Sequence, residues 1–121
     1  MNPSVALRVA AALGFLAVAL GAFGAHGLRE VLAATGRAEE WKTAVVYHLV
    51  HAVLMTALSL RAEVPKLVWS LFAVGIVVFS GSLYVLALTN VRWLGAITPL
   101  GGLSLLAGWL LLMLRPFRAS A

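Results

Sequence analysis

The run TAVVYHLVHAVLMTALSL, residues 43–60, contains no Lys, Arg, Asp or Glu, and its only titratable side chains are those of Tyr47, His48 and His51. At a rise of about 1.5 Å per residue, a helix of this length comes close to the roughly 30 Å hydrocarbon core of a bilayer. We therefore expect residues 43–60 to cross a membrane. Because polar groups at membrane depth are costly, this helix should face protein along one side.

Three further apolar runs, residues 9–25, 67–88 and 94–114, also have spanning length. The chain is 63% apolar and only 11% charged, whereas soluble domains have about 25% charged residues. These features predict an all-α protein, a four-transmembrane-helix bundle in which the 121 residues form a single integral membrane domain. Residues 9–25 are a longer run than the apolar core of a secretory signal, so we expect them to be a retained span.

The connections between the runs are short. After the first run, Leu28, Val31 and Leu32 keep helical spacing in a polar context, which predicts a short interfacial helix between helices one and two that ends near Gly36. Pro65 precedes the third run, where a missing backbone N–H costs nothing at a helix start. The second and third helices are therefore expected to be antiparallel neighbours.

Basic side chains flank the runs, with five toward the end that carries both termini and four toward the other. The two groups are Arg8, Arg61, Lys66, Arg115 and Arg118, and Arg29, Arg37, Lys42 and Arg92. This excess predicts that both termini lie in the cytoplasm, with the protein in a bacterial inner (plasma) membrane. The net charge of +5 is interpreted as membrane orientation and headgroup contact. Because Lys and Arg are not clustered with aromatic residues, no nucleic-acid partner is expected.

Small residues inside the runs predict close contacts between helices. The predicted packing glycines are Gly21, Gly24, Gly81, Gly101 and Gly102. Pro99 is expected to bend the fourth helix there, because it removes one backbone hydrogen bond. Tryptophans occur toward the span ends, as in an interfacial aromatic belt, at Trp41, Trp69, Trp93 and Trp109.

Five motifs follow one another along the chain. They are Gly21-Ala-Phe-Gly-Ala-His26-Gly-Leu28, Trp41 with Ala44-x-x-Tyr47-His48-x-x-His51-Ala52, Phe79-Ser-Gly-Ser-Leu-Tyr84, Ile97-Thr-Pro-Leu-Gly-Gly102 and Gly108-Trp109. In this order they resemble the small membrane-protein family known as domain of unknown function 423, which includes YgdD-like and transmembrane protein 256-like proteins. The resemblance covers nearly the whole chain and implies four helices and a membrane location, but no reaction. One departure is Asn90, which stands where glycine is expected.

The three histidines are the candidate ligand or proton site. On a helix His48 and His51 share a face at i, i+3, and Tyr47 lies four residues before His51. His26 ends the first run on the side where the second begins, so the imidazoles could meet. Supporting polar side chains are expected from the later runs, at Ser80, Ser82, Tyr84 and Thr98.

Three uses of these groups stay open. Neutral imidazoles could hydrogen-bond across the bundle and fix its packing. They could instead bind a metal ion or haem iron, with His26, His48 and His51 as ligands. They could also serve a quinone or a proton path, or line a small-solute path in an oligomer.

No catalytic residue is predicted. The sequence has no Asp or Cys, and its carboxylates lie near the interfaces, at Glu30, Glu39, Glu40 and Glu63, which argues against paired-carboxylate and thiol chemistry. The leading hypothesis is therefore a non-enzymatic scaffold or accessory subunit of uncharacterised role. Its partners would be the lipid bilayer and either further copies of itself or a larger membrane complex. The alternative is one of the histidine-based sites, for which the sequence specifies no particular cofactor.

Overall fold

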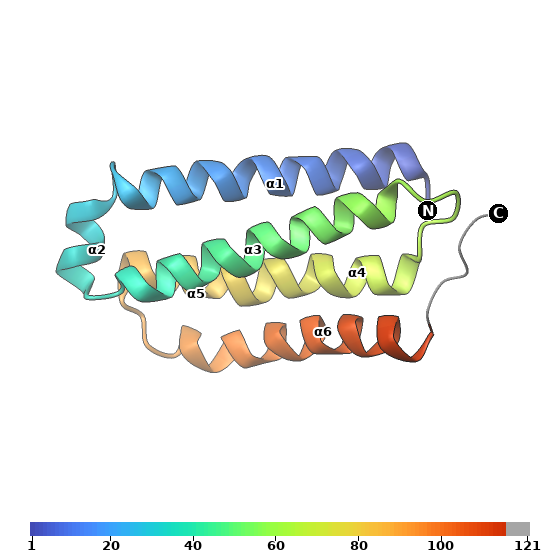
Figure 1. Cartoon of the computed structure of the whole chain (residues 1–121). Helices are drawn as coiled ribbons and strands as arrows, with labels where there is room; N and C mark the ends of the chain where they lie inside the picture. Colours follow the sequence, from blue (N-terminus) through green and yellow to red (C-terminus); the bar gives the residue numbers. More distant parts are fainter. Residues whose placement is uncertain (116–121) are drawn as a thin grey trace.

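The computed structural model describes residues 1–115, in which four apolar helical spans are joined by short connections (Figure 1). The third span is one helical unit made of α4, η1 and α5, and the short α2 lies between the first two spans. The elements in chain order are α1 (Pro3–Ala25), α2 (Arg29–Thr35), α3 (Ala38–Ser59), α4 (Lys66–Gly75), η1 (Ile76–Ser80), α5 (Gly81–Thr89) and α6 (Leu94–Leu114). The predicted four-helix bundle and its interfacial helix are confirmed.

Two spans begin earlier than the apolar runs predict. α1 starts at Pro3 because the Asn2 side chain accepts a hydrogen bond from the amide two residues later at 2.9 Å, and proline suits the first helical turn. α3 starts at Ala38 with Glu39 and Glu40 in its first turn, where carboxylates stabilise the positive end of a helix. Hydropathy marks the part of a helix that crosses lipid, whereas capping residues mark its ends.

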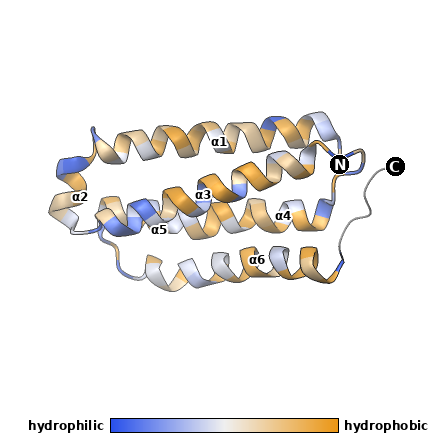
Figure 2. Cartoon of the chain, in the orientation of Figure 1, coloured by the Kyte–Doolittle hydropathy of each residue, from blue (hydrophilic) through white to orange (hydrophobic). Residues whose placement is uncertain are grey.

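The spans form a row in which each packs on the next. α1 lies along α3, α3 along the third span, and the third span along α6. Among the described helices, α1 has backbone neighbours only in α2 and α3. The start of α1, the connection from α3 to α4 and the end of α6 lie at one end of the molecule, and α2 lies at the other (Figure 1). Hydrophilic residues gather toward these ends, and apolar residues cover most of the length between them (Figure 2).

The apolar core lies where side chains from all four spans meet. Met55 and Phe72 are fully buried there, and the small Ala6 and Ala10 bring α1 close to its neighbours. A second buried cluster consists of Leu32, Trp41 and Ala87. It covers the inner face of α2, so the interfacial helix is anchored to the bundle.

Two of the tryptophans do not form the expected interfacial belt. Trp41 and Trp69 are buried, and their indole N–H groups donate to the Leu20 carbonyl at 2.9 Å and to Ser59 Oγ at 3.0 Å. Trp93 is 65% exposed, as a belt residue would be. The belt prediction is wrong for the two buried tryptophans because an indole N–H in apolar surroundings needs a partner, and here other helices supply it.

Asn90 keeps the backbone form for which glycine was expected. Its φ of 56° lies in the left-handed region at the C-cap of α5, which glycine adopts most readily and asparagine next. Its Oδ1 also accepts a hydrogen bond from Arg37 Nε at 3.0 Å. Asn90 therefore forms the turn that glycine would form, and it adds a link to the connection between α2 and α3.

Gly24 and Gly101 lie at very close helix contacts. A Cβ on Gly24 would overlap the indole ring of Trp41, and a Cβ on Gly101 would overlap the backbone of Phe79. Gly81, the glycine of the third span that was expected to pack closely, does not: a Cβ there would meet no atom of the described residues within 4 Å. The close approach of the third and fourth spans is made instead where Gly101 meets the π-helical segment.

The remaining packing positions are less tight. A Cβ on Gly21 would lie 3.2 Å from an α3 valine, and one on Gly102 would lie 3.7 Å from an aromatic ring of η1. α6 continues as a helix through Pro99. Two tight positions were not predicted from the sequence: a Cβ on Gly75 or Gly108 would overlap side chains of the facing helix.

Candidate functional site

The predicted polar groups of α3 lie near the middle of this helix, and they face different surroundings. His48 and His51 are 3% and 4% exposed, whereas Tyr47 is 44% exposed. Residues at i and i+3 are about 60° apart around a helix. The two histidines therefore point into the bundle in different directions, and Tyr47 lies at its rim.

His51 is hydrogen-bonded through both ring nitrogens. Its Nδ1 lies 2.7 Å from the Tyr47 carbonyl oxygen, and Trp109 Nε1 donates to its Nε2 at 3.0 Å. A carbonyl oxygen can only accept and an indole N–H can only donate. The geometry therefore assigns a neutral imidazole with its proton on Nδ1 and its lone pair on Nε2. If Nε2 carried the proton instead, its N–H and the indole N–H would point at each other and neither would have an acceptor.

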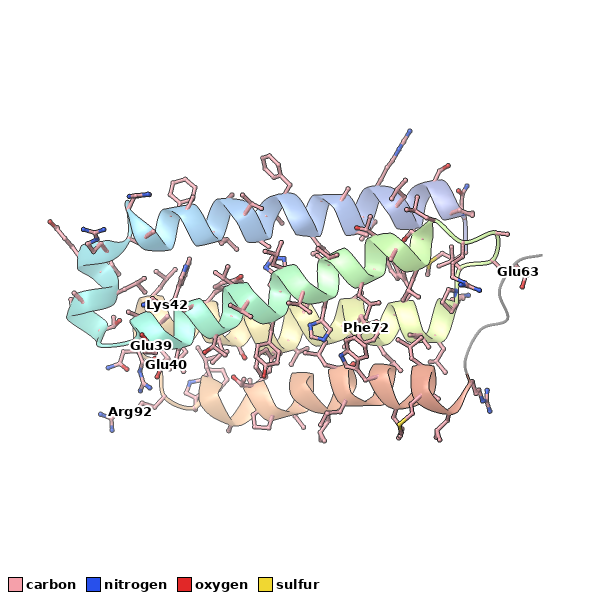
Figure 3. All side chains as sticks on the ribbon, viewed as in Figure 1. Glu39, Glu40, Lys42, Glu63, Phe72 and Arg92 are labelled. Atoms are coloured by element: carbon pink, nitrogen blue, oxygen red, sulfur yellow. The ribbon has the colours of Figure 1, made fainter. Side chains whose placement is uncertain are left out.

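Aromatic rings from two other spans pack against His51. The imidazole centroid lies 5.5 Å from that of Phe72 and 6.0 Å from that of Trp109, and the latter two rings are 5.6 Å apart. The rings of Phe72 and Trp109 meet in a T-shaped arrangement, which is favourable for aromatic pairs. Phe72 points from α4 into the space between the helices (Figure 3). We call His51, Phe72 and Trp109 the three-ring cluster, and it joins α3, α4 and α6.

His48 has a different environment toward α1 and α5. Its Nδ1 lies 2.8 Å from the Tyr84 hydroxyl oxygen, and Tyr84 in turn packs on Trp41 with ring centroids 4.8 Å apart. The imidazole also faces the backbone carbonyl of Leu13 on α1. Its Nε2 is buried and has no hydrogen-bond partner of good geometry within residues 1–115. His48 thus links α3 to α5 through one nitrogen and lies against α1 with the rest of its ring.

The π-helical η1 sets the direction of the polar side chains on the third span. Ser80 Oγ donates to the Ala44 carbonyl at 2.8 Å, and Ser82 Oγ lies 2.6 Å from Thr98 Oγ1. Ser80 therefore bonds to α3 and Ser82 to α6, and these two helices pack on different sides of the third span. The wider π turn, which is common at functional positions, accompanies this divergence.

The predicted site residues do not share one centre. Of the four expected supporting side chains, Tyr84 alone is hydrogen-bonded to a histidine, whereas Ser80, Ser82 and Thr98 bind other groups. His26 is exposed at the C-cap of α1. Within residues 1–115, no group of three His, Cys, Asp or Glu side chains is placed to hold a metal ion.

A groove beside the three-ring cluster opens to the lipid-facing surface. It has a volume of about 360 Å³ and is lined by Tyr47, His51, Phe79, Gly102, Leu105, Leu106 and Trp109. The ring of Tyr47 packs on Phe79 with centroids 4.7 Å apart. The Tyr47 hydroxyl has no hydrogen-bond partner within residues 1–115. It is therefore an available donor at the rim of an otherwise apolar groove.

The sequence analysis missed Trp109 and Phe72 as neighbours of His51. Trp109 was interpreted as a belt residue because it stands near the end of a span. Trp109 is 46% exposed near the span end, which does not contradict that interpretation, but its indole N–H also donates to His51. A helical signal for this contact was present, since Trp109 follows Gly102 by seven residues and so shares the glycine face of α6. Phe72 gave no such signal, because a phenylalanine in an apolar run can face lipid as readily as it can face the protein interior.

Trp109→Phe is expected to lower the free energy of unfolding by about 1 kcal/mol, because it removes the N–H that His51 accepts while keeping an aromatic ring. Trp93→Phe is the matched control, since Trp93 is 65% exposed and its ring contacts no other ring of the described residues. Both variants can be compared by reversible unfolding in detergent micelles. Equal stability of the two would show that the indole N–H contributes nothing to holding α6.

Comparisons with known proteins agree with the membrane architecture. A family model described as "Protein of unknown function (DUF423)" matches residues 20–102, which include all three histidines but not Trp109. The chain is 40% identical to the UPF0382 inner membrane protein YgdD of Escherichia coli (strain K12), over 98% of this chain and 93% of that protein. It is 43% identical to the UPF0382 membrane protein YwdK of Bacillus subtilis (strain 168), over 81% of this chain and 84% of that protein. No solved structure matches the chain significantly.

Proposed function

The chain belongs to the DUF423 family of membrane proteins, and from that premise we propose that it acts as a non-enzymatic scaffold or accessory subunit within the bilayer. In this proposal His48 and His51 are packing residues that hydrogen-bond the helices to one another. The protein's contribution to a membrane assembly would then be its shape and its outer helix surfaces.

The pairing of His51 is the observation that carries the proposal. Both of its ring nitrogens are taken by groups of the protein, the Tyr47 carbonyl and the Trp109 indole. Ligation of iron, copper or zinc by imidazole needs a lone pair on a ring nitrogen. At His51 that lone pair already accepts the hydrogen bond from Trp109, and this supports a packing role.

α1 provides the surface by which such a subunit would bind. Its spanning window is 17% buried, against 44% for the third span, so most of α1 faces outward. Its exposed positions include Ala11, Ala22 and Ala25, and a Cβ on Gly14 would meet no atom of residues 1–115 within 4 Å. Small residues let helices approach closely in membranes. We expect a transmembrane helix of a partner membrane protein to pack along this side of α1.

The start of α1 and the end of α6 are proposed to face the cytoplasm. The basic residues that favour this orientation include Arg8, Arg61, Lys66 and Arg115, together with Arg118, which lies outside the described residues. The Escherichia coli relative is named as an inner membrane protein. The same membrane is proposed for this chain.

The test is an absorption spectrum and a metal analysis of the protein purified from its own membrane in mild detergent. We expect no haem band and no stoichiometric transition metal in the wild type, and lower stability in the His48→Ala/His51→Ala variant. His26→Ala is the control, because its exposed side chain is not hydrogen-bonded to either of the other histidines. Stoichiometric haem or metal that disappears in the double variant would overturn the proposal.

A quinone site is the second candidate, favoured by the Tyr47 hydroxyl, which lies at the groove beside the three-ring cluster and has no hydrogen-bond partner within residues 1–115. A quinone carbonyl would accept from this hydroxyl while its isoprenoid tail lay in the groove. Lipid extracts of the same preparations distinguish this candidate from the first. Quinone that copurifies with the wild type and is lost from Tyr47→Phe would favour the quinone site. Extracts without quinone would rule this site out and leave the scaffold role as the remaining proposal.

A further inference from the structure

α4 begins and α6 ends at the same end of the molecule (Figure 1). A second groove lies there, between these two helices. It has a volume of about 220 Å³ and is lined by Pro65, Lys66, Leu67, Val68, Leu111 and Arg115. Its walls are apolar, and its two charged lining residues, Lys66 and Arg115, are both cations. An apolar channel with cations beside it matches the chemistry of an acyl chain below a negatively charged headgroup.

The two cations of this groove are without ionic partners in the described part of the chain. Neither Lys66 nor Arg115 forms an ion pair or a side-chain hydrogen bond within residues 1–115. The α2 end of the molecule differs, because there Arg37 pairs with Glu40 at 2.9 Å and Lys42 pairs with Glu39 at 3.3 Å. Positive charge is thus left available at the groove and largely compensated at the opposite end.

The start of α4 adds to the positive character of the same groove. Pro65 is the N-cap of α4 and provides no side-chain hydrogen bond, and the first helical amide paired to it is that of Trp69. The preceding amides at the helix start, which include those of the lining residues Leu67 and Val68, remain available as donors. They carry the positive end of the helix dipole, which favours a phosphate group nearby.

We propose that this groove binds one anionic phospholipid, whose phosphate lies between Lys66 and Arg115 and whose upper acyl chain lies against Leu67, Val68 and Leu111. The Arg115 guanidinium can donate two hydrogen bonds to a phosphate, and the Lys66 ammonium adds a compact charge. The apolar walls select a lipid over free phosphate, because inorganic phosphate would leave them uncovered. This site is independent of the role of the histidines.

Native mass spectrometry of delipidated protein in detergent, titrated with phosphatidylglycerol or phosphatidylcholine, tests the site. The wild type should retain phosphatidylglycerol in preference to phosphatidylcholine. K66Q/R115Q should bind phosphatidylglycerol about 25-fold more weakly, since one basic side chain near the surface contributes a factor of about five. R29Q/R92Q is the matched control, because it removes the same charge at the α2 end, and it should bind like the wild type.

Three results would overturn the proposal: equal affinity of the wild type for the two lipids, equal losses in the two double variants, or displacement of the lipid by millimolar inorganic phosphate. The second would mean a general charge effect and the third a free anion site. Thermal unfolding of each variant is measured alongside. If K66Q/R115Q does not fold, the single variants K66Q and R115Q replace it, each expected to lose about fivefold in affinity.

Discussion

Gly101→Ala is expected to lower the free energy of unfolding by about 3 kcal/mol or more, which is at the upper end for overpacked sites. The added methyl would overlap the backbone of Phe79, and a backbone cannot rotate away as a side chain can. Relief therefore requires the third and fourth spans to separate at η1. That movement would also disturb the bond between Ser82 and Thr98, which are 2.6 Å apart at their hydroxyls.

The neighbouring Gly102→Ala is the control for this prediction. Its added methyl would lie 3.7 Å from the nearest ring atom, an ordinary van der Waals contact. Since alanine also has the higher helix propensity, this variant should be as stable as the wild type or slightly more stable. Equilibrium unfolding in micelles, followed by circular dichroism, compares the two. Similar stabilities for both variants would mean that α6 does not approach the π-helical segment as closely as described.

His51→Ala is expected to destabilise the protein by about 3 kcal/mol. The substitution opens a space beside the contacting rings of Phe72 and Trp109, and it leaves the Trp109 N–H without its acceptor. Both effects fall on the contact that joins α3 to α6. Thermal unfolding and the retained helical content of the variant measure the loss.

A double-mutant cycle separates the hydrogen bond from the ring packing. In a Trp109→Phe background, His51→Ala should cost about 1 kcal/mol less than in the wild type, because no indole N–H remains to lose its partner. His26→Ala should leave stability within about 0.5 kcal/mol of the wild type, as expected for a surface substitution. A folded and fully stable His51→Ala protein would remove the basis for treating this histidine as a packing residue.

Run length and hydropathy were sufficient to predict the four spans. A helix that crosses a membrane needs a long apolar run, and few other structures have runs of that length and composition. The interfacial helix followed from three apolar residues at helical spacing. The helix ends were harder to predict from the sequence, since α1 begins after an Asn2 cap that lies outside its apolar run. Asn90 shows that a left-handed turn can persist when its residue type departs from expectation.

The partners of the histidines could not be derived from spacing. His48 and His51 share a helix face, yet the nitrogen of one lies beside Tyr84 of α5 and that of the other beside Trp109 of α6. Spacing within one helix fixes directions around its own axis but not the positions of its neighbours. The π turn of η1, which changes the register of the third span, has no hydropathy signal either.

The geometry makes His51 a neutral imidazole whose two ring nitrogens are both hydrogen-bonded by the protein. Nitrogen-15 NMR of histidine-labelled protein in lipid bilayers measures this directly. We predict a protonated Nδ1 and an unprotonated, hydrogen-bonded Nε2 whose resonance shifts in Trp109→Phe, as the contacts with Tyr47 and Trp109 require. A proton on Nε2, or a resonance displaced by metal or haem iron, would contradict the account.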